Sequence, residues 1–130
     1  MLAAYPTPSV QRLAEEVYDI VLARKNEPAR RCITYRQVCN RIGPTSPFNG
    51  KVSPDDEILR LALRYVVERC HAAGLPALSA LVVNARTRRP GPGYYPIAHG
   101  VDITDPNAER LWKRERTRAW RCTTYPVRLP

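Results

Sequence analysis

Apolar residues recur at intervals of three and four in several stretches of this chain, which is the spacing of one face of an α-helix. The pattern predicts helices over residues 9–25, 53–73 and 105–121, and each begins with a residue type that caps helices. In residues 53–73 the apolar positions cover most of the helix circumference and leave only a narrow polar ridge. We therefore expect this helix to form the centre of the core.

The segment Arg31–Gly43, RCITYRQVCNRIG, changes from a β-prone run to a helical pattern at Thr34. Thr34 and Gln37 have the spacing of a capping box, in which each side chain bonds the other residue's backbone N–H. The pattern predicts a short strand over residues 31–34 and then a helix that stops at the glycine. The outward face of this helix carries four side chains that can bond to phosphates or bases: Arg36, Gln37, Asn40 and Arg41.

Two later segments are rich in residues that favour β-structure. Leu78–Asn84 (LSALVVN) predicts a strand, and Tyr94–Ile97 (YYPI) predicts a second strand that pairs with it. The connector ARTRRPGPG contains three arginines, two prolines and two glycines, so we expect an exposed, mobile hairpin tip. Residues 31–34 should join this hairpin in a small antiparallel sheet, with a loop over residues 44–52 and an extended tail. The predicted core includes Tyr35, Val38, Ile58, Leu61, Tyr65, Leu81 and Val83.

The order helix, strand, helix, helix, β-hairpin is that of a winged helix, so the fold class predicted is α+β. We expect one domain over residues 1–130, with a core of about residues 9–121 and three to four helices. ITYRQVCNRIG, the later LRLALRYV and a strand ending in VVN resemble the DNA-binding half of alkyltransferase-like proteins, over residues 13–97. That family's Pro-Cys-His-Arg motif is absent, because residues 75–83 read LPALSALVV. The resemblance implies the fold and contact with DNA, but not alkyl transfer.

The same resemblance implies that the third helix enters a DNA groove, where Arg60 and Arg64 would reach the duplex. The first turn of that helix argues against this, since Asp55, Asp56 and Glu57 would be repelled by phosphate. The alternative is that both arginines pair with nearby acids on a solvated ridge. DNA contact through the third helix is therefore an open question in the sequence.

Charge is the strongest compositional signal: 21 basic against 12 acidic residues give a net charge of +9. Residues 24–41 carry a net +5 and residues 84–130 a net +6, as expected of an anion-binding surface. Only three of the basic residues are lysines. Arginine binds phosphate and guanine in bidentate fashion, although a GC-rich genome also favours arginine and proline. The later block supplies the remaining candidates: Arg86, Arg88, Arg89 and Tyr94 as a wing with a stacking ring, and Arg114, Arg118 and Arg121 on the last helix.

Motifs for chemistry are missing from the sequence. The four cysteines are scattered without C-x-x-C spacing, and the two histidines lie in no zinc or nucleophile motif, so we expect no metal, no cofactor and no catalytic residue. The first ten residues lack the features of a signal peptide, and no apolar run is long enough to span a bilayer. These features predict a cytoplasmic protein without a membrane anchor.

Two hypotheses about function follow from the sequence. In the first, the chain is a small non-enzymatic regulator or accessory factor that contacts duplex DNA mainly through phosphates. In the second, it is a protein-interaction module whose basic surface meets an acidic protein, such as a phage or mobile-element inhibitor of a host complex that handles nucleic acid. Net charge alone fits both hypotheses, and it leaves the oligomeric state open.

Overall fold

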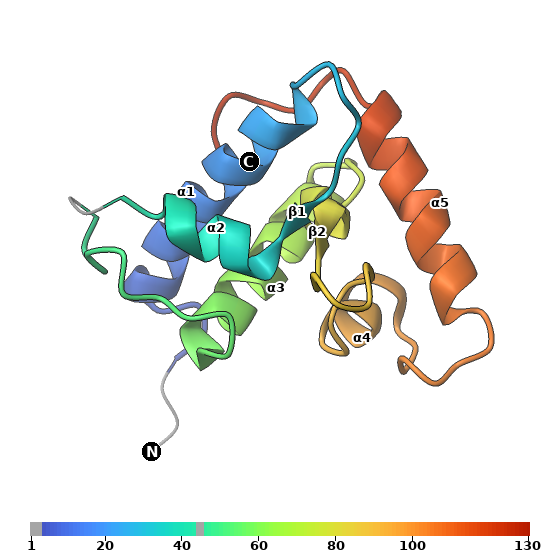
Figure 1. Ribbon diagram of the computed structural model, residues 1–130, viewed down its shortest axis with the longest axis horizontal. Coiled ribbons are helices and arrows are strands. Elements are labelled where there is room, and N and C mark those ends of the chain that lie inside the picture. Colours follow the sequence, from blue (N-terminus) through green and yellow to red (C-terminus); the bar gives the residue numbers. More distant parts are fainter. Residues whose placement is uncertain (1–3, 44–45) are drawn as a thin grey trace.

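The computed structural model describes residues 4–43 and 46–130, which contain five α-helices, one 3₁₀-helix and two short strands. Figure 1 shows α1 and α3 side by side, α2 next to them, and α5 at the opposite edge of the molecule. Of the predicted loop over residues 44–52, the described residues 46–52 form no helix or strand, and residues 44–45 lie outside the described residues. The elements in chain order are α1 (Pro8–Lys25), β1 (Ile33–Thr34), α2 (Tyr35–Arg41), α3 (Glu57–Ala72), η1 (Leu78–Leu81), β2 (Val82–Val83), α4 (Tyr94–His99) and α5 (Ala108–Arg121).

The long helices predicted from periodicity are confirmed, but their first residues differ. The N-cap of α1 is Thr7, whose hydroxyl accepts a hydrogen bond from the backbone N–H of Val10 at 3.2 Å. α3 begins four residues later than predicted, because the Asp56 carboxylate accepts from the backbone N–H of Ser53 at 2.8 Å and holds residues 53–56 in a turn. Short polar side chains thus end up in the turn before the helix.

The capping box predicted for α2 is confirmed. The Thr34 hydroxyl accepts from the backbone N–H of Gln37 at 3.1 Å, and the Gln37 amide oxygen accepts from the backbone N–H of Thr34 at 2.9 Å. Both bonds are local, so they form wherever this sequence enters a helix. β1 covers only the last two residues of the predicted strand.

The predicted antiparallel sheet is wrong, and the winged-helix arrangement is not confirmed. β1 and β2 form a parallel pair with Ile33 opposite Val82 and Thr34 opposite Val83. α2 and α3 form the crossover that a parallel pair requires. Residues 78–81 form the 3₁₀-helix η1 and leave only two residues of the predicted strand 78–84 extended. The coarser prediction of a mixed α+β fold is confirmed, but the described residues contain five α-helices where three to four were expected, because the predicted second hairpin strand is helical.

The segment predicted as the second hairpin strand is the helix α4. Pro96 lies in its first turn, where a missing N–H breaks no helical bond. Gly100 ends the helix with φ +68°, a conformation that glycine adopts without strain. β-propensity in Tyr94 and Tyr95 is overridden because both rings are buried against other elements.

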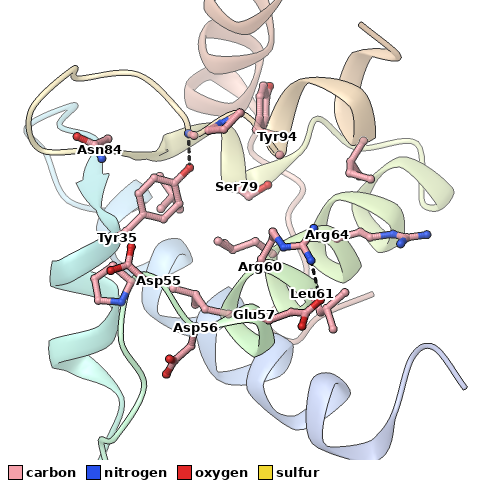
Figure 2. Close-up of a pocket in the computed structure, with 18 of the residues that line it drawn as sticks. Tyr35, Asp55, Asp56, Glu57, Arg60, Leu61, Arg64, Ser79, Asn84 and Tyr94 are labelled. Carbon is pink, nitrogen blue, oxygen red and sulfur yellow. Dashed lines mark hydrogen bonds and ion pairs between the residues drawn. The ribbon is translucent and has the colours of Figure 1, made fainter. Parts of the chain in front are cut away.

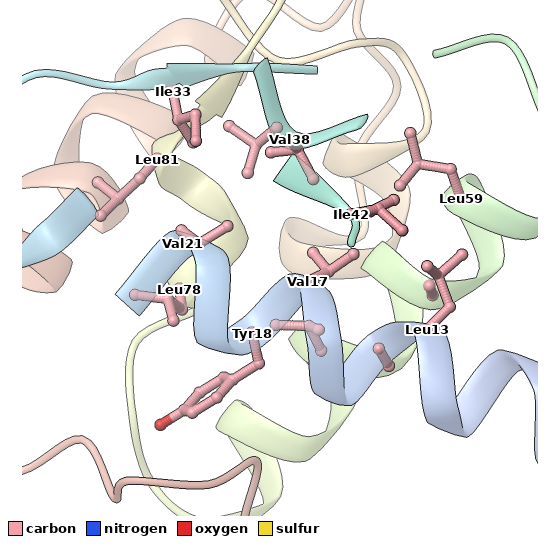
Figure 3. Close-up of a cluster of buried hydrophobic side chains, with 14 of the residues drawn as sticks. Leu13, Val17, Tyr18, Val21, Ile33, Val38, Ile42, Leu59, Leu78 and Leu81 are labelled. Atoms are coloured by element: carbon pink, nitrogen blue, oxygen red, sulfur yellow. The ribbon is translucent and has the colours of Figure 1, made fainter. Parts of the chain in front are cut away.

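The main core lies between α1, α3 and η1 (Figure 3). Leu13, Val17 and Val21 of α1 are fully buried, and Leu59 of α3 and Leu81 of η1 face them. Of the predicted core, Val38, Leu81 and Val83 are buried, whereas Tyr35, Ile58, Leu61 and Tyr65 are only half-buried.

A second cluster of buried side chains joins η1, β2, α4 and α5. Trp112 of α5 is its largest member, and its indole N–H donates to the carbonyl of Ala80 at 2.9 Å. After α5 the chain forms no helix or strand and returns over the first core, where the Tyr18 hydroxyl donates to the carbonyl of Pro126 at 2.6 Å. The tail thereby fixes α5 relative to α1.

Candidate functional site

A cleft of about 780 Å³ opens between α2, α3, and the chain from β2 to α4 (Figure 2). Its walls are apolar side chains, among them Leu59, Leu63 and Val67 of α3, with Val82 of β2 and Ile97 of α4 opposite. Four arginines also line it, and we call these the rim arginines: Arg36, Arg60, Arg64 and Arg86.

Ser79 supplies a polar group to this otherwise apolar interior. The residue lies in η1, is 5% exposed and lines the cleft, and Figure 2 shows its side chain on the cleft side of the ribbon. Its hydroxyl has no hydrogen-bond partner in the described part of the chain and is shielded from solvent. An unpaired buried hydroxyl is costly, and a ligand that reaches it would supply the missing bond.

Tyr35 forms one wall of the cleft and fixes the loop at its mouth. Its phenol oxygen accepts a hydrogen bond from the backbone N–H of Gly91 at 2.7 Å (Figure 2). Burial raises the pKa of Tyr35, against the opposing effect of the bond from Gly91, so the phenol stays neutral. The ring therefore presents an uncharged aromatic surface to the cleft.

The loop between β2 and α4 is organised by Asn84. Its side-chain oxygen accepts hydrogen bonds from the backbone N–H groups of Arg86 at 2.8 Å and Thr87 at 3.3 Å. The backbone N–H of Asn84 donates to the backbone carbonyl of Arg89 at 2.8 Å. Arg88 in this turn has φ +60°, a left-handed conformation that non-glycine residues adopt only occasionally. The predicted exposed tip is confirmed in that residues 84–89 are exposed, but this turn leads into a helix and not into a β-hairpin.

Three acids occupy the end of the cleft at the start of α3. Asp56 is engaged with the backbone of Ser53, and the Glu57 carboxylate pairs with the Arg60 guanidinium at 2.7 Å. Asp55 is exposed beside them. This end of α3 repels anions, as the sequence indicated, so an anionic ligand would enter from the arginine side.

The cleft brings together five of the residues that the sequence selected: the four rim arginines and Tyr94. Arg36 and Arg86 are exposed and have no ion-pair partner among the described residues. Arg64 lies 3.4 Å from Glu68 and stacks on the Tyr5 ring. The other outward side chains of α2, which are Gln37, Asn40 and Arg41, are exposed beside the cleft without lining it.

The remaining predicted residues lie away from the cleft. Arg89 pairs with Glu109 of α5 at 3.0 Å, and Arg118 pairs with the buried Glu115 at 3.3 Å. Arg88 is exposed on the turn, and Arg114 and Arg121 are exposed on α5. Each basic block therefore contributes one arginine to the cleft, Arg36 and Arg86, whereas the other predicted arginines of the later block lie elsewhere.

The expectation that Tyr94 is an exposed ring for stacking on bases is wrong. It is 9% exposed, and its hydroxyl lies 2.9 Å from Nε2 of His99. Burial raises the pKa of Tyr94, so its hydroxyl keeps its proton. Only part of the Tyr94 ring borders the cleft, as a wall and not as an exposed stacking surface.

Sequence reasoning missed Ser79 and Asn84. The sequence signal for Ser79 is a small polar residue inside the apolar run LPALSALVV. That signal fits a solvent-facing strand position as well as a buried one, and only the tertiary structure distinguishes them. Asn84 ends the same run, and asparagine after a strand is a common turn signal.

The described residues contain no group of three or more His, Cys, Asp or Glu side chains able to hold a metal ion. His71 lies 2.7 Å from the Glu115 carboxylate, and His99 bonds Tyr94, so neither histidine bonds Ser79. Within residues 4–43 and 46–130, no helix combines the length and apolarity needed to cross a membrane.

Comparisons with protein-family models, with curated proteins and with solved structures found no match to this chain.

Proposed function

We propose that this protein is a non-catalytic DNA-binding module that holds the duplex backbone with its rim arginines and accepts one unstacked base in the cleft. The observation that carries the proposal is the convergence of four arginines on one cleft with an unpaired hydroxyl inside it. The resemblance to the DNA-binding half of alkyltransferase-like proteins points the same way.

Phosphate binding is supported by the state of the rim arginines. Arg36 and Arg86 are exposed and have no ion pair with any residue that the structure describes, so they are available to bind anions. Arg60 and Arg64 pair only with exposed or half-exposed carboxylates, and such surface pairs contribute little to stability. A phosphate can therefore replace the carboxylate at small cost. Arginine's planar guanidinium also suits bidentate phosphate contact.

Base binding is supported by the shape and lining of the cleft. Its volume of about 780 Å³ lies within the range of small-molecule sites, roughly 300–1,000 Å³. A base extruded from a duplex presents a flat apolar body with polar edges. The Tyr35 ring and the apolar side chains of α3 and β2 would contact the body, and the Ser79 hydroxyl can donate to or accept from an edge.

The proposed cleft binds the base and does not catalyse a reaction on it. A serine nucleophile needs an adjacent base, and the Ser79 hydroxyl has no hydrogen-bond partner in the described residues. The acids at the start of α3 would repel a backbone lying over them. We therefore place the backbone along the arginine side of the cleft.

The backbone part of the proposal is tested by changing rim arginines together. Substituting Arg36, Arg60 and Arg86 with glutamine should weaken binding to unrelated duplex sequences alike, because phosphate contacts carry no sequence information. The slope of log K against log salt should flatten by about 0.9 for each arginine–phosphate pair that the substitutions remove. Fluorescence anisotropy between about 50 and 200 mM salt measures both quantities.

A matched control removes the same charge elsewhere. The triple variant with glutamine at three exposed positions away from the cleft serves this purpose: Arg12, Arg30 and Arg128. Equal weakening in the two triple variants would show that only net charge matters. If the wild-type protein has no duplex affinity even at low salt, the arginines face an acidic protein and the second hypothesis replaces this one.

The base part is tested with a duplex that carries a fluorescent adenine analogue opposite a mismatched base. Unstacking raises its fluorescence, so wild-type protein should increase the signal more for the mismatched than for the matched duplex. Ser79→Ala should reduce this preference and leave the salt slope unchanged. Binding without any fluorescence change in the wild type would contradict base extrusion while leaving phosphate binding intact.

A further inference from the structure

α5 carries a cationic face that the cleft does not use. The helix contains six basic and two acidic residues, and one of the acids, Glu115, is 4% exposed. Ala108, Trp112 and Ala119 are buried on its inward side. Six residues on the other side are exposed, and we call them the α5 face: Arg110, Lys113, Arg114, Thr117, Arg118 and Arg121.

This face points away from the cleft. The inward side of α5 packs on η1 and α4, and both of these elements contribute residues to the cleft. No residue of α5 lines the cleft, and Figure 1 shows α5 at the edge of the molecule opposite α2. The α5 face is therefore a separate cationic surface that does not belong to the cleft.

The charge pattern of the α5 face is unfavourable in the isolated protein. Arg114 has Arg110 and Arg118 four residues away on either side, and like charges at this spacing destabilise a helix. Only the edges of the face are neutralised, where Lys113 and Arg118 pair with acids at 3.3 Å. Arg114 and Arg121 have no partner among residues 4–43 and 46–130. A bound polyanion would relieve this repulsion.

The dimensions of the face suit a nucleic-acid backbone. From Arg110 to Arg121 the helix rises by about 16 Å, at 1.5 Å for each residue. That length matches about five base-pair steps of 3.4 Å along the duplex axis. A regular row of arginines also fits the regular row of phosphates better than it fits the irregular carboxylates of a folded acidic protein.

We propose that the α5 face binds the phosphate backbone of a second duplex, so that one molecule joins two DNA segments. This inference rests on the proposed function for its first duplex, because the cleft holds that segment. Sequence-independent binding is expected at the α5 face, since Arg114 and its neighbours are exposed cations placed to contact phosphates, and phosphate contacts carry no sequence information.

A bead assay tests the bridge. Immobilised duplex should capture a fluorescent duplex of unrelated sequence only when wild-type protein is present. Glutamine at Arg110, Arg114 and Arg121 should abolish capture and leave single-duplex affinity close to that of the control triple variant, which changes residues 12, 30 and 128. Sedimentation of each protein shows whether capture requires a dimer.

Four outcomes would overturn the inference. The first is that the variant with glutamine at Arg110, Arg114 and Arg121 captures as much duplex as the control variant does. The second is that the wild-type protein binds one duplex and does not capture another. The third is capture that occurs only when the protein is dimeric. The fourth is displacement of the captured duplex by polyglutamate of matched charge as readily as by free duplex, because the face would then be one for acidic proteins. Absence of all duplex binding would instead overturn the proposed function and this inference together.

Discussion

Removing the Ser79 hydroxyl should stabilise the free protein. The hydroxyl is buried and unpaired, and burying such a group costs about 1–3 kcal/mol in mutational data. Ser79→Ala deletes a single oxygen atom, so the cavity that it leaves is small and offsets only part of the gain. We expect the free energy of unfolding to rise by about 1 kcal/mol, a factor of about five in the ratio of folded to unfolded protein.

Urea denaturation resolves a change of this size. With a slope of about 2 kcal/mol per molar, the midpoint should rise by about 0.5 M. Ser53→Ala is the matched control, because the Ser53 hydroxyl accepts from the backbone N–H of Asp55 at 3.3 Å in an exposed turn. Loss of that bond should lower stability by about 0.5 kcal/mol, so the two serine variants should shift in opposite directions.

The sign of the Ser79 effect decides whether the hydroxyl is unsatisfied. A decrease of about 1 kcal/mol or more in Ser79→Ala would mean that the hydroxyl already has a partner, such as a bound water. The cleft would then contain no unsatisfied group for a base to bond. A gain in stability together with a weaker preference for the mismatched duplex would show a residue kept for binding at the expense of stability.

Two further predictions concern the Tyr35–Gly91 hydrogen bond at the cleft and the half-buried His99 of α4. Tyr35→Phe removes the acceptor for the Gly91 N–H, so we expect a loss of about 1 kcal/mol and faster hydrogen exchange at that amide; unchanged exchange would contradict the role of Tyr35 in fixing the loop. Burial lowers the pKa of His99 below its ordinary value of 6.5, against the opposing effect of Glu115, so the unfolded chain takes up a proton at higher pH than the folded one. Stability should therefore be fully present above about pH 6.5 and fall as the pH drops towards the folded pKa, and His99→Gln should remove this component in urea titrations at several pH values. A pH dependence that is identical in His99→Gln and wild type would contradict this assignment.

Local interactions explain which structural predictions were correct. The capping box of Thr34 and Gln37 joins residues three apart, and the apolar stripe of residues 9–25 needs only the geometry of a single helix. The three acids at the start of α3 likewise form the anion-repelling end that the sequence predicted, because they are neighbours along the chain. Such features depend on neighbours along the chain, so periodicity and spacing suffice to predict them.

The wrong predictions concern segments whose conformation depends on distant residues. Residues 78–83 are buried on all sides, and an apolar run without alternation does not distinguish a strand from a helical turn. Tyr94 and Tyr95 favour strands, yet the second cluster, which includes Trp112, buries them in a helix. The direction of the β1–β2 pair followed from the crossover through α2 and α3.

Some features of the candidate site can also be predicted from the sequence, whereas others depend on the tertiary structure. The sequence by itself selected the rim arginines as candidate anion-binding residues and showed that the family's alkyl-transfer motif is absent, because charge and residue type are properties of single positions. Only the tertiary structure decided that Arg36, Arg60 and Arg86 meet at one cleft while Arg114 and Arg121 lie on a separate face. It also decided that Ser79 is buried without a partner, since burial and hydrogen bonding are set by residues far apart in the chain.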